Sequence, residues 1–173
     1  DVDMTFAEIL NQSSNVGISL ATEKAGFDKL NAMIERLKIT EKTGVDYPGE
    51  AQATMPDFNE WAYVTGCNIS FGQGLTASPL TMARFYGMVA ADGLLCTPHF
   101  LISKPQTGEW VEYESEQVID DQVALDKLKG MLKGVVQSGT GTDAAIENYE
   151  VAGKTSTAEI AENGGYAESC YNL

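Results

Sequence analysis

Apolar residues recur at helical spacing throughout the N-terminal part of the chain. The spacing predicts a short helix from residue 3 to about residue 11, capped by Asp3, and a second helix over residues 16–25 that stops at Gly26. A third amphipathic helix is predicted over residues 27–37, because its apolar side chains fall on one face. Short helices therefore open the chain.

Two longer helical patterns follow an aperiodic segment. Residues 40–60 are interrupted by Gly and Pro and are predicted to form a loop. The clearest helical pattern covers residues 78–92, with Pro79 in its first turn and Gly93 as its terminator. Residues 121–137, capped by Asp120 or Asp121, are predicted to form another long helix.

The predicted strands are short and gather toward the C-terminus. Residues 100–103 and 110–113 flank a turn at residues 106–108 and are predicted to form a hairpin. Residues 149–160 are a further strand candidate, and residues 166–173 have the pattern of another strand. Helices in the middle and strands at the end indicate an α/β (α+β) fold.

Composition and charge exclude several classes of protein. Lys and Arg number 11 against 25 Asp and Glu, so the formal net charge is −14 and a nucleic-acid partner is not expected. A hydrophobic fraction of 43% is typical of a globular chain and argues against disorder. No run approaches the roughly 20 apolar residues that a bilayer crossing requires.

The cysteines do not suggest a metal site or a disulfide framework. Cys67, Cys96 and Cys170 are widely spaced, form no Cys-x-x-Cys pair, and are accompanied by a single histidine, His99. We expect each cysteine to fill a small buried space, and we expect no metal ligands and no cofactor.

The tripeptide Ser13-Ser14-Asn15 lies in the predicted turn between the first two helices. A hydroxyl and a carboxamide two residues apart on such a turn can face one point, where the hydroxyl passes a proton and the amide contacts a peptide group. Ser and Asn are also the commonest helix caps, and the tripeptide alone favours that structural role.

A second polar cluster, Lys154-Thr155-Ser156-Thr157, follows Gly153 within the strand candidate. An ammonium, hydroxyls and unpaired backbone N–H groups along a strand edge suit an anionic ligand with an extended peptide backbone. An exposed edge strand whose lysine opposes aggregation explains this segment equally well. Another Lys-Thr-Gly, at residues 42–44, has no strand pattern before it and is interpreted as a surface turn.

Both clusters, with the segments between them, resemble the transpeptidase domain of class B, high-molecular-weight penicillin-binding proteins. The resemblance covers nearly the whole chain, because several segments follow in family order. It implies a penicillin-binding/β-lactamase-like transpeptidase fold, present over residues 1–173 as an incomplete domain with a helical subdomain and part of an antiparallel sheet. The matching segments are residues 12–19, 42–50, 71–91 and 135–159.

The resemblance implies catalytic roles for three residues. Ser13 and Asn15 correspond to the family's Ser-x-Asn pair, and Lys154 opens its Lys-Thr-Gly element. Ser13 is expected to carry the proton of a nucleophilic serine to the leaving amine. Asn15 is expected to hold the substrate amide and orient the catalytic lysine, while Lys154 supplies positive potential for the substrate's carboxylate and for proton relay.

The same resemblance implies substrate-binding roles for the residues after Lys154. Thr155 and Thr157 are expected to bind the terminal carboxylate, and the backbone N–H of Thr157 is expected to donate to the oxyanion. Ser156 stands where the family usually has Gly, so its side chain either narrows the substrate groove, alters its specificity or points away.

The family's nucleophilic motif, Ser-x-x-Lys, is absent, because no serine in the sequence is followed by lysine three positions on. The motif lies upstream of the Ser-x-Asn turn in the family, so we expect these residues to be a C-terminal piece of a longer enzyme. Without the serine we expect no useful turnover and no covalent penicillin adduct. Loss of the central helix that carries it is expected to expose apolar surface and to favour self-association.

The parent activity that the resemblance implies is a peptidoglycan D,D-transpeptidase acylated by β-lactams. It would cross-link stem peptides ending in D-Ala-D-Ala at the extracytoplasmic face of the bacterial cell membrane, anchored by an N-terminal helix and working with a membrane glycosyltransferase. A serine β-lactamase is the alternative enzyme, although residues 40–60 offer several carboxylates with nothing to choose among them as the base. A noncatalytic β-lactam- or peptidoglycan-binding domain is the alternative of another class.

Overall fold

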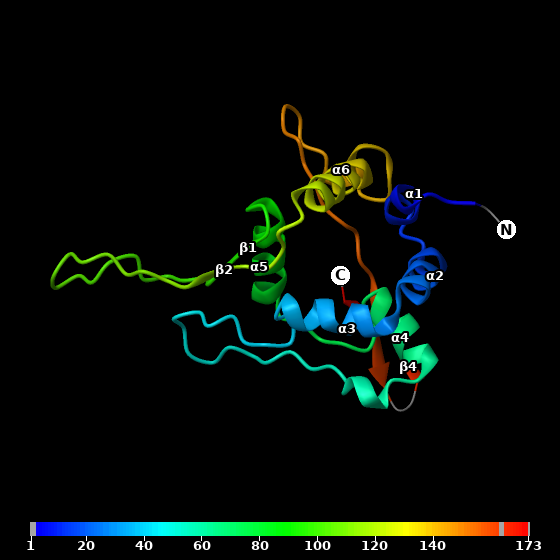
Figure 1. Cartoon of the computed structure of the whole chain (residues 1–173), viewed down its shortest axis with the longest axis horizontal. Coiled ribbons are helices and arrows are strands. Elements are labelled where there is room, and N and C mark those ends of the chain that lie inside the picture. Colours follow the sequence, from blue (N-terminus) through cyan, green and yellow to red (C-terminus); the bar gives the residue numbers. More distant parts are fainter. Residues whose placement is uncertain (1–2, 163–164, 173) are drawn as a thin grey trace. The chain divides into compact units, whose positions relative to one another are not determined.

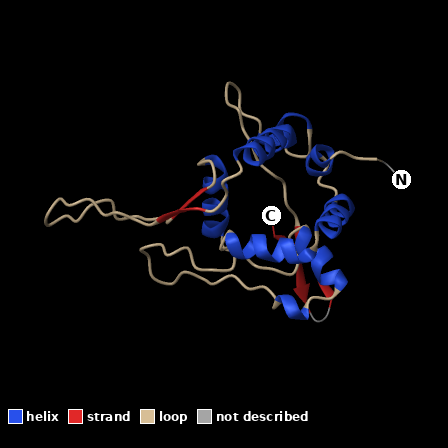
Figure 2. Cartoon of the chain, viewed as in Figure 1, coloured by secondary structure: helices blue, strands red, loops and turns tan. Residues whose placement is uncertain are grey.

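The computed structural model describes residues 3–162 and 165–172 of the chain (Figure 1). Helices account for most of its regular structure, and the strands form two antiparallel pairs (Figure 2). In chain order the elements are α1 (Phe6–Asn11), α2 (Asn15–Ala25), α3 (Phe27–Arg36), η1 (Phe58–Glu60), α4 (Tyr63–Ser70), α5 (Pro79–Ala90), β1 (Leu94–Cys96), β2 (Ser115–Gln117), α6 (Gln122–Ser138), η2 (Thr142–Ala144), β3 (Ala158–Glu162) and β4 (Gly165–Asn172).

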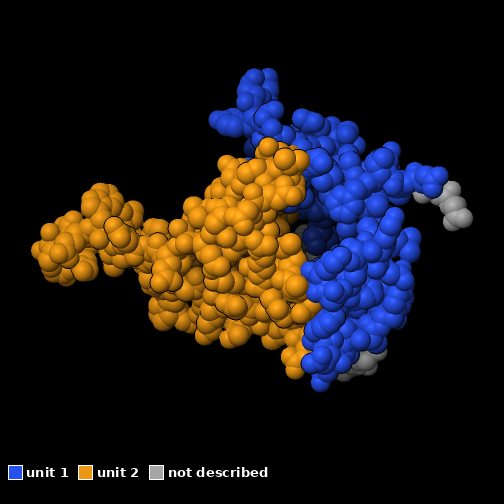
Figure 3. Space-filling view, in the orientation of Figure 1, with its two compact units in different colours: residues 1–30, 58–74, 127–173 blue, residues 31–57, 75–126 orange. Residues whose placement is uncertain are grey.

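The chain divides into two compact units, coloured separately in Figure 3. Unit 1 comprises residues 1–30, 58–74 and 127–173, and unit 2 comprises residues 31–57 and 75–126. Both polar clusters singled out from the sequence belong to unit 1, so the candidate site lies within that unit.

Helix α1 begins with a capping box. The Thr5 hydroxyl accepts from the backbone N–H of Glu8 at 3.3 Å, and the Glu8 carboxylate accepts from the N–H of Thr5 at 2.7 Å. The backbone hydrogen bond from Thr5 lowers the pKa of Glu8. The predicted cap Asp3 was wrong, because the reciprocal box satisfies two helix N–H groups where Asp3 alone would satisfy one.

Helix α2 packs against α4, a helix whose sequence lacks helical periodicity and was not predicted. The Ser19 hydroxyl on α2 lies 3.2 Å from that of Ser70 on α4, and the Ser70 hydroxyl donates to the Cys67 carbonyl at 2.6 Å. A Cβ at Gly66 would lie 2.7 Å from the Phe27 ring, so glycine allows this ring to contact α4 closely. Small residues and polar contacts therefore define this helix pair.

Helix α6 supplies the buried centre of unit 1. Leu132, Val135 and Val136 are buried, with no exposed surface on Val135. Asp121 caps the helix, since its carboxylate accepts from the N–H of Ala124 at 2.9 Å, as the sequence predicted. The apolar face of a well-capped helix thus forms the platform on which the following chain packs.

The strand predicted over residues 149–160 was placed too early. Residues 151–157 form no regular strand, and β3 begins only at Ala158, which pairs with Asn172 of β4. Residues 150–155 instead pack against α6, where the N–H of Gly153 donates to the Leu132 carbonyl at 3.2 Å. The Lys154 cluster therefore lies in the segment leading to the sheet rather than on its edge.

Unit 2 is centred on α5 and the chain that returns past it. Ser78 caps α5 by accepting from the N–H of Thr81 at 3.0 Å, and Pro79 occupies the first helical position. Gly93 ends the helical region with φ at 92°, and a Cβ there would lie 2.1 Å from the Ile119 carbonyl oxygen. Glycine is thus required where these two backbones meet.

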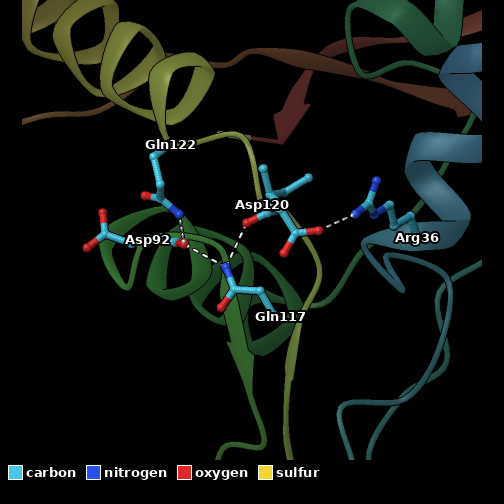
Figure 4. A network of polar contacts seen from close by, with 6 residues as sticks. Arg36, Asp92, Gln117, Asp120 and Gln122 are labelled. Carbon is cyan, nitrogen blue, oxygen red and sulfur yellow. Dashed lines mark hydrogen bonds and ion pairs between the residues drawn. The ribbon is translucent and has the colours of Figure 1, made fainter.

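Glutamine side chains hold the returning chain to the end of α5 (Figure 4). The Gln117 amide donates to the carbonyls of Asp92 at 2.8 Å and Ile119 at 2.7 Å, and the Gln122 amide donates to the Asp92 carbonyl at 2.9 Å. These bonds occupy both protons of the Gln117 amide. The chain entering α6 is therefore fixed to the turn that ends α5.

The predicted hairpin forms, but its regular strands lie farther from the turn. Strands β1 and β2 pair Leu95 with Glu116, while the segments nearer the turn share a single bridge between Ser103 and Trp110. Asp46 holds the hairpin by accepting backbone N–H bonds from residues 100 and 101, both at 2.8 Å. These N–H bonds lower the pKa of Asp46.

The expectation that every cysteine is buried was wrong for Cys96, which is exposed on β1, and Cys67 is half-buried. The Cys170 side chain lies outside the described side chains.

In the described part of the chain, no helix is both long and apolar enough to cross a membrane. The same residues contain no group of three His, Cys, Asp or Glu side chains suited to a metal ion.

Candidate active site

Ser13 occupies the turn between α1 and α2 in a left-handed conformation. Its φ is 53°, in a region that residues other than glycine seldom adopt, and its N–H donates to the Leu10 carbonyl at 3.1 Å. Its side chain is half-buried. Backbone strain of this kind concentrates at functional positions, where surrounding structure holds a side chain in place.

The helix-capping role belongs to Ser14. Its hydroxyl accepts from the N–H of Gly17 at 3.1 Å and caps α2. Asn15 is the first residue of α2; it is exposed, and its side chain forms no hydrogen bond within the described residues. The structural and chemical interpretations of the tripeptide therefore apply to different residues, and the Ser13 hydroxyl is available for another partner.

That partner is Lys154. Its Nζ donates to the Ser13 hydroxyl at 2.6 Å and to the Thr155 carbonyl at 2.8 Å. Nζ also lies 3.5 Å from the Thr155 hydroxyl. Burial lowers the pKa of the Lys154 ammonium, because desolvation disfavours its charged form. The two clusters singled out from the sequence thus meet through a direct hydrogen bond.

The segment that carries Lys154 is anchored on both sides. Lys133 on α6 forms an ion pair with Glu150 at 2.7 Å, and this hydrogen bond lowers the pKa of Glu150. Beyond the backbone bond at Gly153, the Thr155 hydroxyl lies 2.6 Å from the hydroxyl of Thr140. Contacts to α6 and to the turn after it therefore replace the strand pairing that the sequence predicted.

Thr140 is a site residue that the sequence analysis did not assign. The only signal for it was its position in the Gly-Thr-rich turn at residues 138–142, which belongs to a segment in family order. Ser156 and Thr157, which the resemblance placed in the site, are exposed and form no hydrogen bond to Ser13 or Lys154. The structure joins Ser13, Lys154 and Thr155 and leaves the other predicted residues beside them.

The arrangement is suited to proton transfer and to anion binding. A lysine ammonium can only donate, so the Ser13 oxygen must accept, and the Ser13 proton remains available for another acceptor. The partly buried ammonium supplies positive charge where water screens it less than at an open surface. The Thr140 and Thr155 hydroxyls beside it share one hydrogen bond, so the pair adds one neutral donor.

Residues 1–172 match the family described as penicillin binding protein transpeptidase domain. Penicillin-binding protein PbpB of Mycolicibacterium smegmatis is 32% identical over 166 residues, which cover 90% of this chain and 26% of that protein. Peptidoglycan D,D-transpeptidase FtsI of Buchnera aphidicola is 29% identical, with 97% of this chain and 29% of that protein covered.

A similar solved structure is penicillin binding protein 3 of Mycobacterium tuberculosis in complex with aztreonam. It has a TM-score of 0.87 and 29% identity, and the match covers 96% of this chain and 40% of that one. The same protein has been solved with ampicillin, with a TM-score of 0.88. The chain spans about a quarter of the length of the curated relatives named above.

Proposed function

The chain belongs to the penicillin-binding protein transpeptidase family, and from this premise we propose that it forms the Ser-x-Asn and Lys-Thr-Gly side of a peptidoglycan D,D-transpeptidase site. The observation that carries the proposal is the 2.6 Å hydrogen bond from Lys154 to Ser13. It supports a shared proton path between the early turn and the late polar segment.

The proposed reaction has two acyl-transfer steps. A serine hydroxyl attacks the carbonyl carbon of the penultimate D-Ala, and the peptide C–N bond breaks to release the last D-Ala as an amine. The proton lost by the serine passes through the Ser13 hydroxyl to that leaving amine. An amine of a second strand then attacks the acyl-serine ester, forms the cross-link, and returns a proton to the serine oxygen.

Lys154 contributes positive charge to both steps without forming a covalent bond. Its ammonium donates to Ser13, which favours the hydroxyl orientation that releases a proton toward the substrate. It also attracts the substrate's terminal carboxylate. A β-lactam carries a carboxylate and a strained amide carbonyl, so the same groups would promote its acylation of the serine.

The residues flanking this pair are assigned supporting roles. Asn15, exposed at the start of α2, would contact the substrate amide and the catalytic lysine of the nucleophile motif. Thr155 and Thr157 would donate to the terminal carboxylate, and the Thr157 N–H would donate to the oxyanion. Ser156 would border the substrate groove at the position where the family has glycine.

The nucleophile itself is proposed to lie outside the printed sequence, which contains no Ser-x-x-Lys. Mass spectrometry after incubation with benzylpenicillin tests this directly. We expect the chain as printed to gain no mass, and we expect the complete natural protein that contains it to gain one penicilloyl group. A stoichiometric adduct on the printed chain would contradict the assignment of the nucleophile.

The complete protein is proposed to act outside the cytoplasmic membrane, where stem peptides ending in D-Ala-D-Ala are found, and to work with a membrane glycosyltransferase. Acylation followed by rapid hydrolysis would instead identify a serine β-lactamase. Binding of β-lactam or peptide without any acylation by the complete protein would identify a noncatalytic binding domain.

A further inference from the structure

Thr140 joins two parts of the candidate site. Its hydroxyl lies 2.6 Å from the Thr155 hydroxyl, and its backbone N–H donates to the carbonyl of Asn11 at 3.0 Å. Asn11 ends α1, two residues before Ser13. The residue therefore contacts both the segment that carries Lys154 and the helix that leads into the Ser13 turn.

The backbone on either side of Thr140 is closely constrained. The N–H groups of Gly139 and Gly141 both donate to the Val135 carbonyl, at 3.1 Å and 3.0 Å. A Cβ on Gly139 would lie 2.5 Å from the Asn11 carbonyl oxygen, which leaves no room for a side chain. Thr140 is thus presented from a fixed turn, and its hydroxyl has a defined position relative to Thr155.

The pair of hydroxyls has two arrangements, because each group carries one proton. When Thr155 donates to Thr140, the Thr155 proton is used inside the protein. When Thr140 donates, the Thr155 oxygen accepts and its proton is free for an acceptor outside. Lys154 Nζ, 3.5 Å from the Thr155 oxygen, can only donate to it and is compatible with both arrangements. A carboxylate can only accept, so a Thr155 hydroxyl that donates to one must accept from Thr140, which is the second arrangement.

We propose that Thr140 is a positioning residue that turns the Thr155 hydroxyl proton toward a substrate carboxylate. This inference rests on the proposed function, because it requires Thr155 to meet a carboxylate. Thr140 itself contacts no substrate atom. It acts by donating its hydroxyl proton to the Thr155 oxygen, which leaves the Thr155 proton free for the carboxylate. A chain of donors from Thr140 through Thr155 to an anion is reinforced by polarisation along its length.

The size of the effect follows from the freedom of a hydroxyl. Without its donor, the Thr155 hydroxyl samples about three staggered positions, which alone costs about threefold in binding. Loss of the donor also weakens the hydrogen bond that Thr155 gives to a charged acceptor, so we expect a total loss of about three- to tenfold.

The test uses the complete protein and two peptide substrates, one ending in acyl-D-Ala-D-Ala with its free carboxylate and one with a C-terminal carboxamide. The T140V variant keeps the shape of the side chain without the hydroxyl, and T140S restores a hydroxyl. We expect T140V to lower kcat/KM about three- to tenfold for the carboxylate and less than about twofold for the carboxamide. T140S should regain wild-type selectivity.

A double variant and the wild-type control separate the explanations. T140V combined with T155V should be no slower on the carboxylate than T155V alone, because Thr140 acts through Thr155. Equal losses on both substrates, or full additivity, would overturn the positioning role. A wild-type protein that does not distinguish carboxylate from carboxamide would overturn the proposed function and this inference together, whereas selectivity unchanged by T140V would overturn the inference alone.

Discussion

The ammonium of Lys154 lies 2.6 Å from the hydroxyl of Ser13, although 141 positions separate the two residues in the chain. Neither residue lies within a helix or strand: Ser13 is in a strained turn, and Lys154 is in the segment before β3. Each is held by its neighbours, through the Ser14 cap on one side and the α6 contacts on the other. The residues that hold this pair in place should therefore affect mainly stability, whereas Ser13 and Lys154 should affect mainly activity.

Replacement of Ser13 tests whether its backbone strain is retained for its hydroxyl. S13G removes the penalty for a positive φ, so it should unfold with a free energy about 1 kcal/mol higher than S13A. Both variants should lose acylation by penicillin in the complete protein, on the order of 10²-fold, because both lack the proton-carrying group. Urea unfolding and stopped-flow acylation measure the two effects, and an active S13G would rule out the assigned role.

Ser14 provides the adjacent control. S14A removes the hydroxyl that accepts from Gly17, so the unfolding free energy should fall by about 1 kcal/mol. Acylation by penicillin should stay within about threefold of wild type, because Ser14 caps a helix and contacts neither Ser13 Oγ nor Lys154 Nζ. A large loss of acylation with unchanged stability would show that the two serines have been assigned the wrong roles.

The tight turn after α6 makes a steric prediction. G139A places a Cβ against the Asn11 carbonyl and the Val135 backbone, neither of which can move as a side chain can, and should destabilise by about 1–3 kcal/mol. G130A is the matched control within α6, where a Cβ meets nothing within 4 Å, and should stabilise by about 0.5–1 kcal/mol. Thermal unfolding of both variants measures these effects. A G139A variant as stable as wild type would contradict this geometry.

The lowered pKa of Lys154 predicts a pH dependence of stability. Burial lowers its pKa from the ordinary value of 10.5, so on approaching that pH the unfolded chain binds more protons than the folded chain. The desolvation cost is fully present below the folded-state pKa and is relieved as pH rises through that pKa toward 10.5. The stability of wild type relative to K154M should therefore increase as pH rises toward 10.5, and a decrease would mean that the folded protein raises this pKa.

Local signals in the sequence were sufficient for most helices. Gly26, Pro79 and Asp121 mark the ends and caps that the structure contains, because these residues act through nearest-neighbour geometry. Helix α4 was missed because it owes its place to contacts with α2 and to the room that Gly66 leaves for Phe27. Such contacts join distant segments and leave no periodic pattern.

The site was less accessible to local reasoning. Taken alone, the tripeptide Ser13-Ser14-Asn15 favoured a helix-capping role. That prediction is confirmed for Ser14 but gave no information on the contacts of Ser13. Lys154 was expected on a strand edge, but contacts to α6 hold its segment before β3 begins. The role of the Thr140 hydroxyl could not be predicted from local sequence, because its partner Thr155 is fifteen residues later in the chain.

A double-mutant cycle on Ser13 and Lys154 tests the central claim most directly. The second-order rate of acylation by benzylpenicillin is measured for the complete protein, S13A, K154M and the double variant. If the two residues form one proton path, each single change should cost on the order of 10²-fold and the double variant should be within about threefold of the slower single variant. Losses that multiply to about 10⁴-fold would show that they act independently and would contradict the account.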